Sequence, residues 1–202
     1  MGGLTFTKSI FNRYTVGSGV GSINSSNRAA LKRRAYNSQC KDIAVIETKA
    51  RFVKVFFRGK DGIIQISQLA VYVDGVNIAP NGIATAPNYH GSPEEIGYPI
   101  DGVLMPRNYQ DYGVYHSASP SGLEIPSGFG YWLLDLGEEY KVDTIVYYNR
   151  NGYVERAIGM LIETYDKNYD INSPNDSVAL NQFTLNRDLI QTFNLQENTP
   201  PG

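Results

Sequence analysis

The side chains that most often perform catalysis are scarce in this chain. It has two histidines, His90 and His116, and a single cysteine, Cys40. The sequence carries no nucleophile elbow, no phosphate-binding glycine loop and no paired cysteines that could hold a metal. The adjacent carboxylates Glu94 and Glu95 lie in a turn-like context, which is typical of solvated surface charges and does not favour a glycosidase pair. These residues therefore predict a protein that is not an enzyme.

Residues suited to binding are better represented, in a segment rich in proline, glycine, tyrosine and asparagine that runs from residue 79 to residue 127. Long loops of this kind often carry the binding residues of a β-sandwich. A small-ligand site needs aromatic faces for an apolar surface of the ligand and hydrogen-bond donors for its polar groups. The candidates for such a site in this segment are Tyr89, Arg107, Tyr109, Tyr112, Tyr115 and His116.

These tyrosines also have a second interpretation. Tyrosine covers a large area at a low cost in entropy, so the same residues could pack loops onto the body or contact a protein partner. Arg150 and Arg156 offer further donors to a ligand. Arginines in such positions more often brace loops against carboxylates of the same chain, and we favour that interpretation for this pair.

Three short apolar runs predict the strands that must position these side chains. Residues 131–134, 145–148 and 158–162 are rich in aromatic or branched side chains and are bounded by polar or turn-forming residues. Runs of this length are typical of buried strands, because a helix needs a longer periodic pattern. Trp132 is expected in the core. Residues 135–139 and 149–152 are expected to form turns between the strands.

Further strands are expected on both sides of this central stretch. Residues 43–57 and 63–72 read as a hairpin joined at residues 58–62, which contain Asp-Gly, and Asp74-Gly75 predicts a second tight turn. The alternating residues 181–185 and 190–195 predict two more strands. The pattern as a whole is that of an all-β protein.

The charge is distributed unevenly. Residues 1–41 contain seven basic and no acidic side chains, whereas the rest of the chain holds eleven basic and twenty acidic ones. The segment is rich in glycine and serine, and residues 28–36 predict one short helix capped by Ser25-Ser26-Asn27. The basic side chains of this helix, which could anchor the arm to a partner, are Arg28, Lys32, Arg33 and Arg34.

The arm therefore has two interpretations. It could be a solvated extension that lies against the acidic body, or an anchor that becomes ordered on a partner. A protein partner is favoured over nucleic acid, because only Tyr36 is interleaved with the basic cluster. A membrane surface is likewise less favoured than a protein.

Several motifs together resemble discoidin-like domains, which are the coagulation factor 5/8 type C and galactose-binding-like modules. The resemblance covers roughly residues 49–166, and the order of its strands looks permuted, because the pair similar to the family's closing strands comes first. The motifs that carry it are residues 132–137 (WLLDLG), 148–150 (YNR) with Arg156 and Gly159, 76–80 (VNIAP), 100–102 (IDG), 115–117 (YHS), 50–55 and 64–72.

The resemblance implies a jelly-roll-like β-sandwich, preceded here by the basic arm with its short helix. It also implies sugar binding, for which the glycan candidates would be Tyr89, Arg107, Tyr109, Tyr112, Tyr115 and His116. Neither histidine is followed by the Arg-x-Asp motif of the fucose-binding members. The family's structural calcium would fall on Asp101 and Gln68. Gln68 and Val103 stand where the family has charged or amide side chains, so the resemblance implies at most a weak calcium site here.

The basic arm is similar to N-terminal segments of virion proteins of large DNA viruses. We therefore predict a minor capsid (cementing) protein that resides in the virion, has other capsid proteins as partners, and contains no signal peptide or transmembrane segment. The alternative is a lectin-like module that binds glycans through the Tyr/His loops. The expected divisions are residues 1–41 for the arm, 42–195 for the β-sandwich and 196–202 for a tail.

Overall fold

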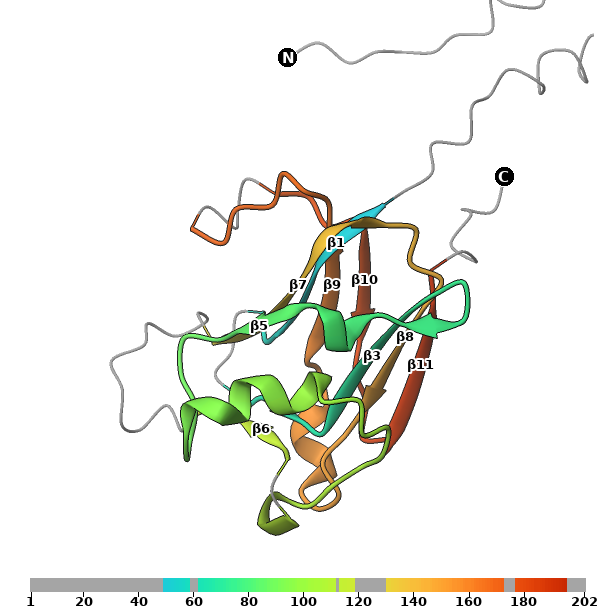
Figure 1. The fold of residues 1–202 in the computed structure, drawn as a ribbon. Helices are drawn as coiled ribbons and strands as arrows, with labels where there is room; N and C mark the ends of the chain where they lie inside the picture. The colour runs from blue at the N-terminus through green and yellow to red at the C-terminus, as the bar shows by residue number, and fades with distance from the viewer. Residues whose placement is uncertain (1–48, 59–61, 112, 119–129, 173–176, 196–202) are drawn as a thin grey trace, which may run out of the picture. The chain divides into compact units, whose positions relative to one another are not determined.

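The computed structural model describes residues 49–58, 62–111, 113–118, 130–172 and 177–195. Within them the chain folds as an all-β sandwich of antiparallel sheets, as the sequence predicted (Figure 1). The basic arm and its predicted helix lie outside the described residues. In the described part of the chain, none of the helices combines the length and the apolar character needed to cross a membrane.

One layer is a five-stranded sheet in the order β10-β9-β1-β7-β5, and the other is a four-stranded sheet in the order β11-β8-β3-β4. A short pair, β2 with β6, forms a third sheet. The strands of the five-stranded sheet are β1 (Ala50–Phe56), β5 (Ile83–Thr85), β7 (Tyr131–Tyr140), β9 (Leu161–Tyr165) and β10 (Asn181–Thr184). Those of the four-stranded sheet are β3 (Gln68–Val73), β4 (Val76–Asn77), β8 (Thr144–Tyr148) and β11 (Ile190–Asn194). The pair consists of β2 (Gln65–Ile66) and β6 (Tyr115–His116).

In the described part of the chain, four short 3₁₀ helices lie in the connections: η2 (Ala79–Asn81), η3 (Pro93–Ile100), η4 (Tyr109–Asp111) and η5 (Val154–Ala157). Three of them belong to the proline-rich segment, which the sequence predicted to be loop-rich. Proline fixes one backbone angle and donates no hydrogen bond, so the segment forms short turns of helix rather than long strands. η3 packs against β3, β5 and β6 (Figure 1).

One hydrophobic core joins the two layers. Its members come from alternate positions of the strands, because successive side chains of a strand point to opposite faces. Val53 and Val55 of β1 and Leu69 and Val71 of β3 are all fully buried in one cluster. Trp132 is fully buried as well, and its indole Nε1 donates to the backbone oxygen of Ile96 at 2.9 Å, so its prediction as a core residue is confirmed.

Two predicted turns have different outcomes. The Asp74-Gly75 turn between β3 and β4 is confirmed: both residues have positive φ, 50° and 76°, as a two-residue hairpin turn requires. The predicted hairpin around residues 58–62 is wrong. β1 pairs with β7 and β9 in one sheet, whereas β2 and β3 belong to the other two sheets, so the chain crosses between sheets at this point.

The bounds of two other predicted strands also differ. Residues 135–139 do not end the strand, because β7 continues to Tyr140 through Gly137, whose φ is 86°, and its register against β1 shifts between Ala50 and Phe52. Residues 158–160 are not part of β9, which begins at Leu161 after η5. The predicted strands at residues 181–185 and 190–195 are confirmed as β10 and β11.

Candidate binding site

The β2–β6 pair brings two polar side chains together at one end of the sandwich. Gln65 lies directly opposite His116 in the ladder, and both are buried, with exposed fractions of 1% and 7%. β6 is too short to continue a sheet, and the chain on both sides of it runs as loops. Gln65 and His116 therefore form the buried base of the site, beneath the side chains of the neighbouring loops.

The turn after β8 and the following η5 place Arg150 and Arg156 next to Gln65. Asn149 is buried and fixes the turn from inside: its Nδ2 donates to the oxygen of Val154 at 3.0 Å, and its Oδ1 accepts from the amide of Arg150 at 2.8 Å. Arg156 follows in η5, whose N-terminal flank is Tyr153 at φ 58°. A positive φ is uncommon for a residue other than glycine, and the 57% exposed ring of Tyr153 is held in this backbone conformation.

The two guanidinium groups share one neutral acceptor. With its amide oxygen turned toward them, Gln65 accepts from Nη1 of Arg150 at 2.6 Å and from Nη1 of Arg156 at 2.9 Å. The guanidinium carbon of Arg156 lies 4.4 Å from the ring centre of Tyr153, and that of Arg150 lies 5.0 Å from the same ring. Arg150 also lies over the ring of Tyr109, at 5.4 Å.

The prediction that these arginines brace loops against carboxylates is not supported. Within the described residues neither Arg150 nor Arg156 forms an ion pair, and Nε of Arg150 is buried without a hydrogen-bond partner. Burial lowers the pKa of Arg150, and the like charge of Arg156 lowers it further. The two positive charges therefore lie next to a neutral hydrogen-bond acceptor and aromatic rings, none of which carries a negative charge.

His116 is held as a neutral ring beside these charges. Its Nδ1 lies 2.6 Å from the carbonyl oxygen of Ser117, and its Nε2 lies 2.8 Å from the amide oxygen of Gln65 and 3.4 Å from Nη1 of Arg156. Both oxygens only accept, so the neutral ring, which has one N–H, donates to one of them at a time. Burial, with the charges of Arg150 and Arg156, lowers the pKa of His116 to about 4. A second proton would add a third positive charge next to two others.

A second histidine completes this end of the fold. The rings of His90 and His116 lie 4.8 Å apart between centres, and Tyr109 packs edge-on against both. The hydroxyl of Tyr109 donates to Oε1 of Glu95 at 3.0 Å and lies 3.0 Å from Nδ1 of His90. The prediction that Glu95 is a solvated surface charge is wrong: its exposed fraction is 6%, and its Oε2 is buried without a hydrogen-bond partner in the described part of the chain.

We call this group of side chains the rim site. It consists of Gln65, His90, Tyr109, His116, Arg150, Tyr153 and Arg156. Of the predicted glycan candidates it includes only Tyr109 and His116. Tyr115 is buried in the core, with its hydroxyl donating to the oxygen of Asn88, so its prediction as a ligand contact is wrong. Tyr89 is 40% exposed next to His90, and Tyr112 lies outside the described residues.

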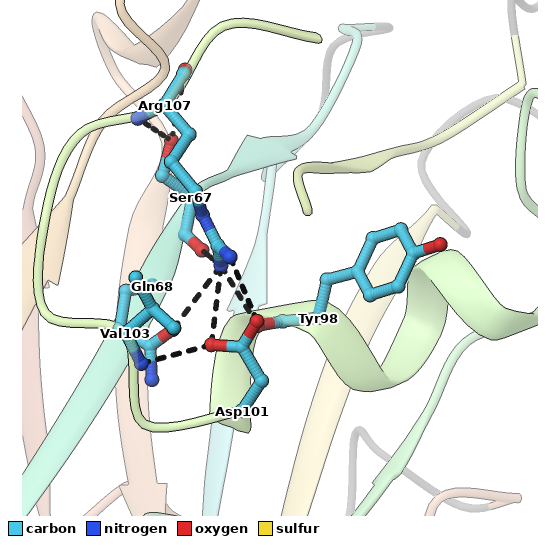
Figure 2. A network of polar contacts seen from close by, with 6 residues as sticks. All are labelled: Ser67, Gln68, Tyr98, Asp101, Val103 and Arg107. Atoms are coloured by element: carbon cyan, nitrogen blue, oxygen red, sulfur yellow. Dashed lines mark hydrogen bonds and ion pairs between the residues drawn. The ribbon is translucent and has the colours of Figure 1, made fainter. Parts of the chain in front are cut away.

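Arg107, the remaining candidate, points into a separate polar network (Figure 2). Its Nη1 donates to Oδ2 of Asp101 at 2.7 Å, and its Nη2 lies within 3.4 Å of oxygen atoms of Asp101, Ser67, Tyr98 and Gln68. The side chain of Arg107 is only 11% exposed, so its charge serves this network and is not offered to a ligand.

The two predicted calcium ligands, Asp101 and Gln68, both belong to this network. Their oxygens do converge, but on the guanidinium of Arg107, which occupies the centre of the set. The residues present therefore do not fit a calcium ion while Arg107 holds this position. Among the described residues, no three histidine, cysteine, aspartate or glutamate side chains gather as a metal site would require.

No family model, no curated protein and no solved structure matches the chain. The resemblance to discoidin-like domains stays a prediction. The four basic residues predicted to anchor the arm, Arg28, Lys32, Arg33 and Arg34, lie outside the described residues.

Proposed function

We propose that the chain is a non-catalytic, lectin-like module that binds a glycan at the rim site. The observation that supports this most directly is the side-by-side arrangement of Arg150 and Arg156 on a neutral acceptor. Guanidinium groups whose charge is not matched by a carboxylate retain donors for the oxygen atoms of a ligand. Sugar hydroxyl, ring and carboxylate oxygens are acceptors of this kind.

The neighbouring rings suit the apolar face of a sugar. Tyr153 is 57% exposed and lies against both guanidinium groups, so a ligand that reaches the arginines also meets an aromatic face. Tyr109 and His90 form a second aromatic surface, and the hydroxyl of Tyr109 donates a hydrogen bond to the buried carboxylate of Glu95. A few convergent polar groups beside aromatic surface are the usual composition of a small-ligand site.

The site is also organised before a ligand arrives. Asn149 fixes the turn that carries Arg150 and Tyr153, and Gln65 holds both guanidinium groups at hydrogen-bond distance. Side chains that are already ordered lose less entropy on binding. The neutral state of His116 leaves the arginines as the charged donors of the site at neutral pH.

A glycan array tests the proposal, with the full chain probed at neutral pH against neutral and acidic oligosaccharides. We expect retention of a subset of glycans, followed by a loss of affinity of at least about tenfold for Arg156→Met and for Arg150→Met, because each removes a charged donor. Lys167→Met is the matched control, since this lysine forms an exposed pair with Glu139 away from the rim site. Failure of the wild-type chain to bind any glycan would refute the proposal, as would wild-type affinity in both arginine variants.

The prediction of a minor capsid protein depends on residues 1–41, outside the described part, and it stays a prediction. The two functions are compatible, since a glycan-binding module can form part of a particle. They are also separable: every residue of the rim site lies between positions 65 and 156, so charge-reversing substitutions of Arg28, Lys32, Arg33 and Arg34 should leave glycan binding unchanged.

A further inference from the structure

Oxygen atoms of four residues converge on the guanidinium of Arg107 (Figure 2). Nη2 carries two hydrogen atoms, yet four oxygens lie within 3.4 Å of it. They are the backbone oxygen of Ser67 at 2.8 Å, that of Tyr98 at 3.2 Å, Oδ1 of Asp101 at 3.2 Å and Oε1 of Gln68 at 3.4 Å. At most two of them can receive a well-directed hydrogen bond at one time.

The remaining atoms of the guanidinium support the same conclusion. Nη1 donates to the other oxygen of Asp101 at 2.7 Å, whereas Nε is buried with no acceptor among the described residues. An arginine that binds through its planar fork of N–H donors would have an acceptor on Nε as well. Here the acceptors gather at the tip of the side chain, where they surround its positive charge. Such a set of carboxylate, carbonyl and amide oxygens is the kind that binds a hard cation.

We propose that the guanidinium of Arg107 is a built-in cation that takes the position a divalent ion would otherwise fill, so that this loop assembles without metal. The loop would then resist chelators and gain nothing from calcium. The oxygens would still suit a small cation if the arginine were absent. With only one carboxylate among its oxygens, the site left empty by the missing arginine would bind calcium weakly, in the submillimolar to millimolar range of low-charge sites.

Arg107 also acts as a positioning residue for the rim site. Its amide donates to Oγ of Ser67 at 2.9 Å, and its carbonyl oxygen accepts from the amide of Asn151 at 2.9 Å. The same residue therefore connects the β2–β3 corner, the end of η3 and the turn that carries Arg150. Tyr109 follows two positions later in η4. The built-in cation thus holds together the loops from which the rim site is made.

Thermal unfolding of the full chain tests this inference, in EDTA and in 10 mM CaCl₂. We expect the wild-type Tm to be the same in both. Arg107→Ala should unfold roughly 5 °C or more below the wild type, because it leaves Asp101 and the carbonyl oxygens without their cation. Part of that loss should return in CaCl₂, and in dilute guanidinium chloride at a concentration too low to denature. Arg51→Ala is the matched control: it removes the partner of Asp135 on a half-exposed surface and should show no such recovery.

A rise of the wild-type Tm in CaCl₂ would overturn the inference, as would an Arg107→Ala chain that regains nothing with either cation. If Arg107→Ala does not fold, a comparison of the Tm values of Arg107→Lys and Arg107→Met tests the inference instead. The lysine keeps a positive charge at the end of a side chain, and the methionine keeps only volume. Arg107→Lys should therefore be the more stable of the two by several degrees, and equal Tm values would show that charge is not what the oxygens require. This test reads stability alone, so its outcome is independent of glycan binding.

Discussion

Ser67 and Arg107 are linked by hydrogen bonds in both directions: Oγ of Ser67 accepts from the amide of Arg107 at 2.9 Å and donates to its carbonyl oxygen at 3.2 Å. Ser67 is fully buried between β2 and β3, so water cannot replace it. Ser67→Ala should lower the free energy of unfolding by about 1–3 kcal/mol, because it leaves a buried backbone N–H without an acceptor. Chemical denaturation measures this loss.

The same substitution also tests how the loops are positioned. Ser67 is not part of the rim site, yet it is hydrogen-bonded to Arg107, two residues before Tyr109. We expect Ser67→Ala to weaken glycan binding severalfold even at temperatures where the chain is fully folded. An affinity equal to that of the wild type in the folded variant would show that the rim site is organised independently of this link.

Tyr153 allows stability and binding to be separated. Its φ of 58° is strained for tyrosine and relaxed for glycine, and its ring is exposed. Tyr153→Gly should therefore leave the free energy of unfolding within about 1 kcal/mol of the wild type, or raise it, while glycan affinity falls roughly tenfold through loss of the aromatic face. Tyr153→Ala loses the ring but keeps the strain, so it should be the less stable variant. If both variants bind as well as the wild type, Tyr153 is not part of the ligand surface.

How much of this arrangement the sequence could predict depends on the range of the interactions. The apolar runs that became β7 and β8 follow local alternation, and the turn at Asp74-Gly75 follows local backbone preference, so these predictions were confirmed. The hairpin at residues 58–62 failed because the choice of sheet is made by partners far away in the chain. A tight-turn signal says that the chain reverses and does not say against which strand it then pairs.

The site shows the same division between local and distant information. His116 and Tyr109 were predicted because polar aromatic residues in a loop-rich segment are visible in composition. Gln65 was missed, since its role comes from lying opposite His116 in a two-residue ladder. The interpretation of Arg150 as a brace against a carboxylate found no support among the described residues, because the presence or absence of a facing carboxylate cannot be seen in sequence. The signal that was available was the pair of histidines within one segment, both of which the fold brings to the rim site.

The outer face of the five-stranded sheet contains two buried charged side chains, Glu163 and Lys54, that give a further prediction. Glu163 is 1% exposed and accepts from Arg58, Tyr165 and Gln182. Lys54, on the neighbouring strand, is 8% exposed, with its Nζ 4.6 Å from the ring centre of Phe56 and 5.7 Å from those of Tyr131 and Tyr169, and burial lowers its pKa.

Substituting these two residues should have unequal effects. Glu163→Gln should cost about 2–4 kcal/mol of unfolding free energy, because it removes the only carboxylate that the described residues place on these donors. Lys54→Met should cost less than about 1.5 kcal/mol, since methionine fills a similar volume among aromatic rings and needs no desolvation. Urea unfolding at neutral pH compares the two. A larger loss for Lys54→Met would mean that the ammonium group, rather than the carboxylate, stabilises this face.

The pKa of His116 predicts a loss of stability in mild acid. The ordinary histidine pKa is near 6.5, and that of His116 in the folded chain is about 4. Between these values the unfolded chain binds the proton and the folded chain does not, so the free energy of unfolding falls as the pH is lowered from about 6.5 to about 4. We expect a decrease of roughly 2 kcal/mol, less than a fully buried ring would give, because solvent reaches part of the site.

Urea unfolding at a series of pH values measures this decrease, and His116→Asn isolates it. The variant keeps a polar side chain opposite Gln65 but has no group at position 116 that titrates between pH 4 and 6.5, so its stability should vary less with pH over that window. The carboxylates of the chain contribute to both proteins alike and cancel in the comparison. The arginines determine the outcome: if Arg150 and Arg156 face His116 as described, the wild type must be the more acid-sensitive chain. Identical pH profiles for the two proteins would mean that the ring accepts its second proton freely and that the charge arrangement of the rim site is wrong.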